Sequence, residues 1–513
     1  MEQEIKLSKN NRVKNTSRNI LWGLLNGLVS VFLPFITRAV ILYLLGAAYL
    51  GIGTLFTSVL QFLGLTELGL GSAVVYTMYR PIAENDTEEI CRILNYFRKM
   101  YRTIGIGMLT VGTLIVPAVP FLIHGESPAG INIYILYYLY LINSVIGYFF
   151  AGYRESILTA HQRKDIAVRC VMLVSVLVQI LQIAVLVSTK NFYAYAFVPI
   201  AGTVITNILY AFFTKRMYPE LCPRGMISAE ERKEIGKNLS GLVGTKLSSI
   251  VLHSSDAIVI SAFLGLTLTA QYGNYYFLME AICGFIATLF TAMTASIGDK
   301  LVRDSLEENY RLFQHISFAN NWLVSWCTIS FVCMIESVIR LVYGESMLLG
   351  WKFSIFMGVY LYIYQIQKTI LTYKDASGIW YSDRFRPYVV MTTNLISNLI
   401  LVNVIGIYGI VLSTIISFLI SLPWINRTLF TKLFHISPYI NLLNIMKNAV
   451  FTIVLCLITY CLCRPLNNGP GGLAGRMVIC GAVPNILWIA AYRKSQDLEY
   501  WKQFMKKMLH LPA

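Results

Sequence analysis

Charged side chains are scarce in this sequence. Only 13% of the 513 residues are Asp, Glu, Lys or Arg, whereas 56% are apolar. A soluble domain usually carries roughly a quarter charged residues, so this composition excludes an ordinary soluble globular protein. A membrane-spanning helix takes about 20 apolar residues, and the apolar content suffices for about 14 such helices. The sequence therefore predicts an all-α, polytopic membrane protein.

The sequence signatures of enzymes and metal sites are also missing. The ten cysteines include no CxxC pair, and most lie inside apolar runs, where packing is the default interpretation. HExxH, GxSxG and GxxxxGK[ST] motifs do not occur. The net charge of +16 comes from short clusters between apolar runs, which is not the pattern of a nucleic-acid-binding face. We expect no catalytic residue, cofactor, metal site or nucleic acid partner.

Apolar stretches divide the chain into fourteen predicted spans. They cover residues 19–45, 48–79, 100–123, 130–153, 168–189, 192–214, 239–264, 268–299, 314–344, 347–373, 387–405, 407–429, 445–463 and 473–492. With these spans, 35 of the 42 basic residues fall on one side, as the positive-inside rule requires of cytoplasmic segments. Five fall on the opposite side: Lys190, Arg340, Lys352, Arg464 and Arg476. We therefore expect both termini on the cytoplasmic side of the cell inner membrane.

The two halves of the chain align at an offset of 219 residues. This offset places Asn238 on Asn19 and Gly265 on Gly46. Two copies of six spans each would keep the same orientation and enclose a cavity between them. The predicted segments are a cytoplasmic N-tail (1–18), a first six-helix bundle (19–214), a cytoplasmic linker (215–238), a second six-helix bundle (239–432), two additional helices (433–492) and a cytoplasmic amphipathic C-tail (493–513). The C-tail is either an interfacial helix on anionic lipid or a loosely ordered basic segment.

Three runs carry a resemblance to a known family. They are RAVILYLLGAAYLGIGTLF (38–56), ELGLGSAVVYTMYRPIAENDTEEI (67–90) and DAIVISAFLGLTLTAQYGNYY (256–276). The chain resembles bacterial oligosaccharide flippases of the Wzx or polysaccharide-transporter type, in the MOP superfamily that also holds MATE drug antiporters and lipid II flippases. The resemblance implies a transporter that moves an undecaprenyl-pyrophosphate-linked oligosaccharide to the outer face by alternating access, beside other polysaccharide assembly proteins.

The seventh span carries a polar stripe. Lys246, Ser249, His253 and Asp256 are spaced by three, four and three residues, which places them on one face of a helix. Ionisable residues inside a membrane are costly and default to functional candidates. We predict that Lys246 and His253 bind substrate, Ser249 lines a cavity and Asp256 couples a cation. Alternatively, Lys246 extends toward the cytoplasm and Asp256 makes contacts near the outer interface.

The offset gives the first span a matching stripe. Asn26, Ser30 and Thr37 are predicted to line the cavity, and Arg38, beside them, to bind the pyrophosphate. Pro34 should kink this helix and serve as a hinge, because proline removes a backbone hydrogen bond.

Further candidates lie in other spans. Gln61 and Glu280 occupy matching positions, so Gln61 is a candidate for the cavity lining and Glu280 for proton or sodium coupling, with a buried structural role as the alternative for Glu280. Gly69 and Gly71 either act as a hinge or allow close helix packing. Two tyrosine-rich spans offer Tyr138 and Tyr362 as sugar contacts, although tyrosines also form membrane-interface belts.

Two other functions compete with the flippase. A cation-coupled drug antiporter would need a cavity rich in acids and aromatic residues, and the spans contain few acids, chiefly Glu280 and Asp256. A membrane glycan polymerase or ligase would need a sizeable exported loop, and the predicted exported loops hold about a dozen residues at most. A lipid II flippase is the third alternative, although Arg38 is the one arginine expected within the spans of the first bundle.

Overall fold

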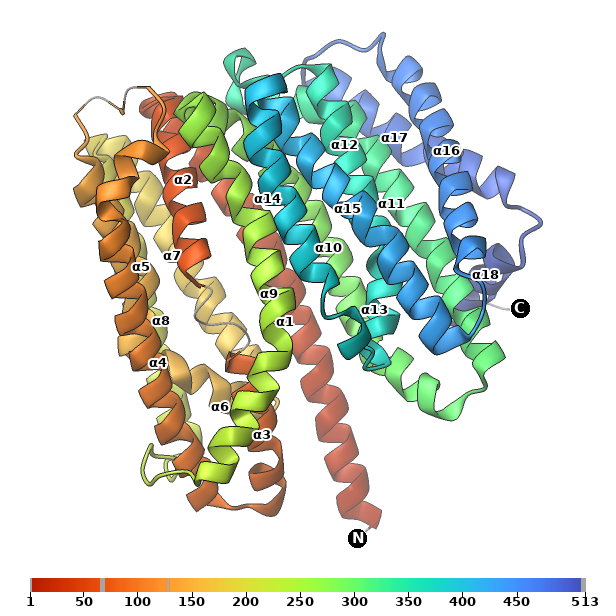
Figure 1. Ribbon diagram of the computed structural model, residues 1–513. Helices are drawn as coiled ribbons and strands as arrows, with labels where there is room; N and C mark the ends of the chain where they lie inside the picture. Colours follow the sequence, from red (N-terminus) through yellow and green to blue (C-terminus); the bar gives the residue numbers. More distant parts are fainter. Residues whose placement is uncertain (1, 65–69, 126, 129, 509–513) are drawn as a thin grey trace. The chain divides into compact units, whose positions relative to one another are not determined.

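The computed structural model describes residues 2–64, 70–125, 127–128 and 130–508, and the secondary structure within them is helical throughout (Figure 1). The chain divides into two compact units, Met1–Ala270 and Gln271–Ala513. Gly69, one of the predicted hinge glycines, lies outside the described residues.

The first unit is built from nine helices and the start of a tenth. Its elements are α1 (Glu2–Leu44), α2 (Ala47–Leu63), α3 (Leu70–Glu84), α4 (Thr87–Ile115), the 3-10 segment η2 (Val116–Leu122), α5 (Ile133–Phe149), η3 (Gly152–Arg154), α6 (Glu155–Ala160), α7 (Lys164–Thr189), α8 (Phe192–Met217) and α9 (Ala229–Leu264). The helix α10 (Leu266–Arg303) begins in this unit.

Side-chain caps set where several helices of the first unit begin. The Asp86 carboxylate accepts a hydrogen bond from the backbone N–H of Glu89 at 2.9 Å, and α4 starts directly after it. Asn132 and Asn191 cap α5 and α8 in the same way. Such caps satisfy backbone N–H groups that lack partners inside the helix. The cores of these helices then pack around fully buried aromatic residues such as Tyr137.

The second unit continues α10 and adds eight helices. They are α11 (Leu306–Tyr343), α12 (Trp351–Ile366), α13 (Lys368–Ala376), α14 (Arg386–Ile405), α15 (Ile407–Leu429), α16 (Pro438–Cys463), α17 (Pro470–Ala491) and α18 (Gln496–Met508). Short connecting elements are η4 (Glu345–Met347), η5 (Tyr381–Asp383) and the π-helical turn η6 (Phe430–Phe434). One core cluster of this unit centres on the aromatic rings of Phe313, Tyr373 and Phe430.

The helices confirm an all-α, multi-pass membrane fold. Eleven of them are long and apolar enough to cross a membrane, and the pair Ile133–Phe149 with Gly152–Ala160, bent by 52°, makes a twelfth if it is one span. The two remaining predicted spans, 48–79 and 347–373, are each occupied by two helices, α2 with α3 and α12 with α13. The hydropathy pattern thus did not separate the two helices within 48–79 or the two helices within 347–373.

The 219-residue offset also relates the beginnings of helices in the two halves of the chain. Gly46 and Gly265 both have a positive φ, of 105° and 92°, and each separates a long helix from the next one. Glycine adopts this backbone conformation without the steric cost that other residues pay. The caps Asp86 and Ser305 lie at the same offset and start α4 and α11. The predicted segment boundaries themselves stay a prediction.

A buried carboxylate joins the start of α7 to Arg18 and Asn19, in the interior of α1. Asp165 has no exposed side-chain surface and forms ion pairs with Arg18 at 2.9 Å, Arg163 at 3.2 Å and Arg169 at 3.0 Å. Its backbone N–H also donates to the side-chain oxygen of Asn19 at 2.7 Å. These contacts fix α1 where the predicted N-tail meets the first span.

The C-terminal segment forms an amphipathic helix, α18, that docks on α11. His315 Nδ1 lies 2.7 Å from an Asp497 carboxylate oxygen, and the His315 ring stacks on Tyr500 with centroids 4.0 Å apart. Trp501 Nε1 donates to the His315 carbonyl at 2.8 Å, and Leu498 is buried in the core of the second unit. Part of the apolar face expected to meet lipid therefore packs on protein.

Candidate functional site

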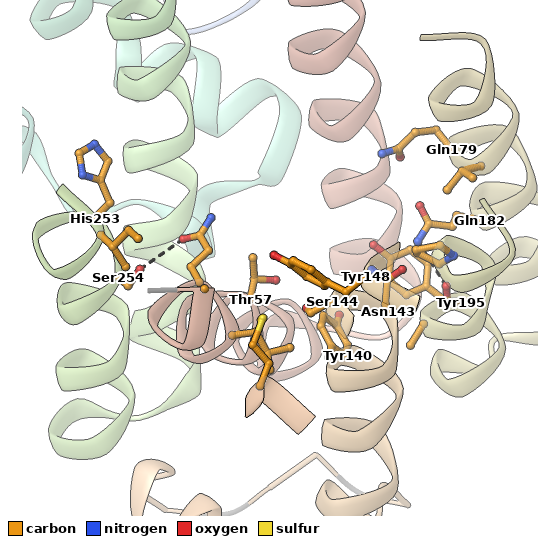
Figure 2. Close-up of a pocket in the computed structure, with 18 of the residues that line it drawn as sticks. Thr57, Tyr140, Asn143, Ser144, Tyr148, Gln179, Gln182, Tyr195, His253 and Ser254 are labelled. Carbon is orange, nitrogen blue, oxygen red and sulfur yellow. Dashed lines mark hydrogen bonds between the residues drawn. The ribbon is translucent and has the colours of Figure 1, made fainter. Parts of the chain in front are cut away.

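The first unit contains a cavity of about 810 Å³. Figure 2 shows that α7 and α9 contribute side chains from opposite sides of it, with α2 and α5 between them. Its lining consists of Thr57, Leu60, Gln61, Gly64, Met108, Tyr140, Asn143, Ser144, Tyr148, Val178, Gln179, Gln182, Tyr195, Ala196, Pro199, Ser249, Ile250, His253 and Ser254. This volume falls in the range of small-molecule sites.

The chemistry of this lining is polar but uncharged. Four amides, four aliphatic hydroxyls, three tyrosines and one histidine face a cavity whose described lining includes no Asp, Glu, Lys or Arg. Amides and hydroxyls both donate and accept hydrogen bonds, and tyrosine adds an aromatic face and a hydroxyl. The arrangement is therefore suited to a neutral ligand with many hydroxyl groups, and its described lining offers no carboxylate to a cationic ligand.

Two of the four residues in the polar stripe of α9 line this cavity. Ser249 and His253 belong to the lining, and His253 Nδ1 lies 2.7 Å from the Ser249 carbonyl oxygen. Lys246 is exposed one helical turn before Ser249 on the same face, and is not part of the lining. Asp256 lies at the other end of the stripe, is 1% exposed, and is likewise not part of the lining.

A contact between α2 and α9 closes one side of the cavity. The Ser254 hydroxyl donates to Gln61 Oε1 at 3.4 Å, as the dashed line in Figure 2 shows. Thr57 lies one turn before Gln61 on α2 and also lines the cavity. The predicted cavity residue Gln61 is thus brought together with Ser249 and His253.

Two residues of α1 approach the cavity through its lining residues. Thr37 is buried, donates to the Leu33 carbonyl at 3.1 Å and hydrogen-bonds the side chain of Gln179. Arg38 is half-buried and lies within electrostatic range of Tyr195. Neither residue is part of the described lining of the cavity.

The other predicted residues of the first two spans lie away from the cavity. Asn26 is half-buried, and the exposed Ser30 hydroxyl donates within its own helix at 2.9 Å. The α1 helix is continuous through Pro34. A Cβ added to Gly71 would meet no atom of the described residues within 4 Å. The hinge role of Pro34 and Gly71 stays a prediction.

The two predicted sugar-contacting tyrosines lie in hydrophobic cores. Tyr138 packs against the core of the first unit, with its ring centroid 6.2 Å from that of Tyr137. Tyr362 is 8% exposed in a core cluster of the second unit. The tyrosines of α5 that line the cavity are Tyr140 and Tyr148, which pack against the same core cluster as Tyr138.

Glu280 belongs to the second unit, whereas the cavity lies in the first. It is half-buried on α10, within electrostatic range of Lys368 on α13. The Lys368 amine in turn lies 5.2 Å from the centre of the Tyr364 ring. The structure places Glu280 beside a cation, which is compatible with either a coupling or a structural role.

The polar groups that α7 contributes were not predicted from the sequence. Gln179 and Gln182 line the cavity, and Gln182 Nε2 donates to the Tyr195 carbonyl at 3.2 Å. On α5, Asn143 accepts a hydrogen bond from the Thr203 hydroxyl at 3.0 Å. Polar residues inside an apolar span are themselves a functional signal, and two glutamines three residues apart in the fifth span could have been identified on this basis.

Comparisons with known proteins agree with this architecture. A family model described as "Polysaccharide biosynthesis protein" matches residues 16–294, which is more than half of the chain. None of the curated proteins matches the sequence significantly.

Solved structures of membrane transporters share the fold. The lipid II flippase MurJ in an inward closed conformation aligns with a TM-score of 0.69 at 16% identity, over 93% of this chain and 99% of MurJ. An inward-facing MATE-family multidrug resistance transporter of the MOP superfamily aligns with a TM-score of 0.59 at 15% identity, over 81% of this chain and 95% of the transporter. A point mutant of the MATE transporter VcmN of Vibrio cholerae aligns with a TM-score of 0.53 at 15% identity, over 84% and 100% of the two chains.

Proposed function

Because the chain belongs to the polysaccharide biosynthesis protein family, we propose that it is a flippase that translocates an undecaprenyl-pyrophosphate-linked oligosaccharide across the cytoplasmic membrane by alternating access. The uncharged, hydrogen-bonding lining of the cavity in the first unit is the observation that carries this proposal.

The cavity lining matches the chemistry of a glycan. Sugar rings present many hydroxyl groups, which amides such as Gln61 and Asn143 satisfy as both donors and acceptors. The apolar faces of sugar rings pack on aromatic rings, which Tyr140, Tyr148 and Tyr195 supply. We assign the sugar contacts in this cavity to these residues, and the sugar contacts expected of Tyr138 and Tyr362, which do not belong to its lining, stay predictions.

Two cations near the cavity suit the pyrophosphate. Arg38 lies within electrostatic range of the cavity-lining Tyr195, and Lys246 is exposed one turn before the cavity-lining Ser249. A guanidinium and an ammonium form charge-assisted hydrogen bonds with phosphate oxygens. We propose that Arg38 and Lys246 neutralise the pyrophosphate while the uncharged lining holds the sugars.

Energy coupling and topology complete the proposal. Asp256 is buried in α9 close to His253, and Glu280 lies in the second unit, so both are candidates for a proton or sodium site. We place both termini in the cytoplasm of a cell whose inner membrane holds the protein, supported by the 35 basic residues on that side. Other polysaccharide assembly proteins are proposed neighbours.

Two alternatives share the fold. A cation-coupled drug antiporter resembles the MATE structures, but a cationic drug would find no acidic side chain in the described lining of the cavity. A lipid II flippase would transport the same lipid carrier with a different glycan, and is separated from our proposal by the substrate that accumulates in its absence.

The decisive experiment is depletion of the protein in its native host. Lipid-linked glycans are extracted, and each species is sorted by whether an enzyme confined to the outer face can reach it. We expect one undecaprenyl-linked oligosaccharide to accumulate on the cytoplasmic side. Accumulation of lipid II would instead identify the lipid II flippase, and an unchanged pool with altered sensitivity to cationic drugs would identify the antiporter.

Variants expressed in the depleted host connect this result to the site. Lys246→Ala and Gln61→Ala should reduce clearance of the accumulated glycan about tenfold, at normal protein levels, because each removes a group that faces or borders the cavity. Lys352→Ala removes an exposed lysine from α12 and should clear the glycan normally. Full clearance by Lys246→Ala would remove this lysine from the mechanism.

A further inference from the structure

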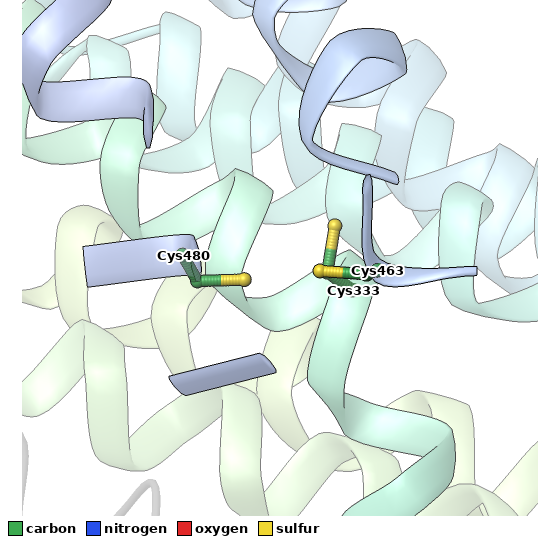
Figure 3. Close-up of side chains that lie close together, drawn as sticks. All are labelled: Cys333, Cys463 and Cys480. Carbon is green, nitrogen blue, oxygen red and sulfur yellow. The ribbon is translucent and has the colours of Figure 1, made fainter. Parts of the chain in front are cut away.

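Three helices of the second unit bring three cysteine thiols together. Cys333 on α11, Cys463 on α16 and Cys480 on α17 are all buried, and their Sγ atoms lie within 4.8 Å of one another. Figure 3 shows the three side chains converging from separate segments of the chain. Because the residues are far apart in the sequence, no local spacing predicted this cluster.

A fourth cysteine and a cavity adjoin the cluster. Cys456 precedes Cys463 by two turns on α16, and its thiol lies beside that of Cys333. Cys333, Cys456 and Cys463 all line a cavity of about 310 Å³ in the second unit. These three thiols therefore border a space that a small ion can occupy, and Cys480 lies next to them.

Arginines line the same cavity. Arg340, Arg464 and Arg476 contribute to its walls, together with one acidic residue, Glu336. The Arg476 guanidinium donates to the Leu466 carbonyl at 3.1 Å, while its buried Nε has no hydrogen-bond partner among the described residues. A metal ion bound by several thiolates carries net negative charge, which these guanidinium groups would offset.

We propose that Cys333, Cys463 and Cys480 bind one thiophilic d10 metal ion, of the class of Zn²⁺ or Cu⁺, with Cys456 available as a fourth ligand. Thiolates are the soft ligands that these ions prefer. With zinc–sulfur bonds of about 2.3 Å, the sulfurs of a tetrahedral site lie roughly 3.8 Å apart, so the observed cluster needs to contract by about 1 Å at most. Each coordinating thiol releases one proton on binding.

Apolar packing is the competing explanation for these thiols. The cluster belongs to a hydrophobic core that also holds Phe318 and Trp488, and an unligated cysteine packs as a small apolar residue. The two explanations differ in what they predict for metal binding. Cys461 provides a matched control, because it lies on the same helix α16 but is exposed and outside the cluster.

The test uses the full chain, purified in detergent, reduced and freed of metal. Zn²⁺ alone is added, unbound metal is removed by dialysis, and the zinc retained per chain is measured. We expect one zinc to be retained per chain in the wild type and in Cys461→Ser. Cys333→Ser and Cys480→Ser should retain at least tenfold less zinc per chain. Equal zinc retention by the cluster variants, or none by the wild type, would overturn the proposal.

A second measurement avoids variants that fold poorly. Wild-type protein is treated with a small alkylating reagent with and without Zn²⁺, and modification at each cysteine is read by mass spectrometry. Zinc should protect Cys333, Cys463 and Cys480 and leave Cys461 unprotected. Equal modification of the three cluster cysteines with and without zinc would contradict a metal site. A disulfide between two of them that survives the reducing treatment would contradict it as well.

Discussion

Replacing Asp165 by Asn removes the negative charge from the centre of an arginine cluster. The carboxylate has no exposed surface, while Arg18, Arg163 and Arg169 around it are 28%, 29% and 37% exposed. The substitution keeps the size of the side chain and one of its oxygens. Its effect therefore reports the charge and not the packing.

The expected loss of stability depends on how deeply the Asp165 carboxylate and the three arginines around it are buried. Removing one partner of a fully buried ion pair costs about 3–5 kcal/mol, because the other charge is left uncompensated. Here the arginines retain contact with solvent, so water offsets part of that cost. We expect Asp165→Asn to lower the free energy of unfolding by about 2 kcal/mol, between the values for buried and for exposed pairs.

The assay is equilibrium unfolding of the detergent-solubilised protein by titration with sodium dodecyl sulfate. Asp299→Asn is the matched control, because Asp299 pairs with Arg303 at 2.8 Å but with both side chains more than half exposed. This control should cost less than about 0.5 kcal/mol. If the two substitutions had equal effects, burial would not be what makes the Asp165 cluster stabilising, and the reasoning would fail.

Two further predictions concern contacts within single units. Gly51→Ala would place a Cβ 2.0 Å from the Leu266 carbonyl oxygen, so the backbone must shift. We expect this substitution to lower the free energy of unfolding by about 1–3 kcal/mol in the same assay. Gly71→Ala, with open space around the added Cβ, should change the free energy of unfolding little. His315→Ala removes the ring that contacts Asp497 and should make the last helix more susceptible to limited proteolysis, and unchanged cleavage would show that this histidine does not hold α18.

Composition and hydropathy were sufficient to predict the membrane fold, because a chain that buries its backbone in lipid must form long apolar helices. They were not sufficient to place the breaks within helices. The break between α5 and α6 depends on η3 at Gly152–Arg154, and α12 and α13 meet at Gln367 without a proline or glycine to mark the division. Hydropathy averages over such short features.

The candidate site was predicted in part. Periodicity correctly grouped Ser249 and His253 on one face of α9, because a regular helix fixes which residues share a side. The same argument could not tell which tyrosines of α5 line the cavity, since Tyr138, Tyr140 and Tyr148 all pack against one core cluster and only the last two belong to the lining. The cysteine cluster was not predictable from one sequence, because three helices must first pack together.

The absence of Asp, Glu, Lys and Arg from the described cavity lining affects how a ligand would respond to salt. Hydrogen bonds from amides and stacking on tyrosine involve no net charge, so mobile ions screen them very little. The proposed contacts of the pyrophosphate with Arg38 and Lys246, in contrast, would weaken as the ionic strength rises. The sugar and the pyrophosphate of one lipid-linked ligand would therefore be separable by ionic strength alone, with the glycan contribution to the affinity persisting at high salt after the phosphate contribution has been screened.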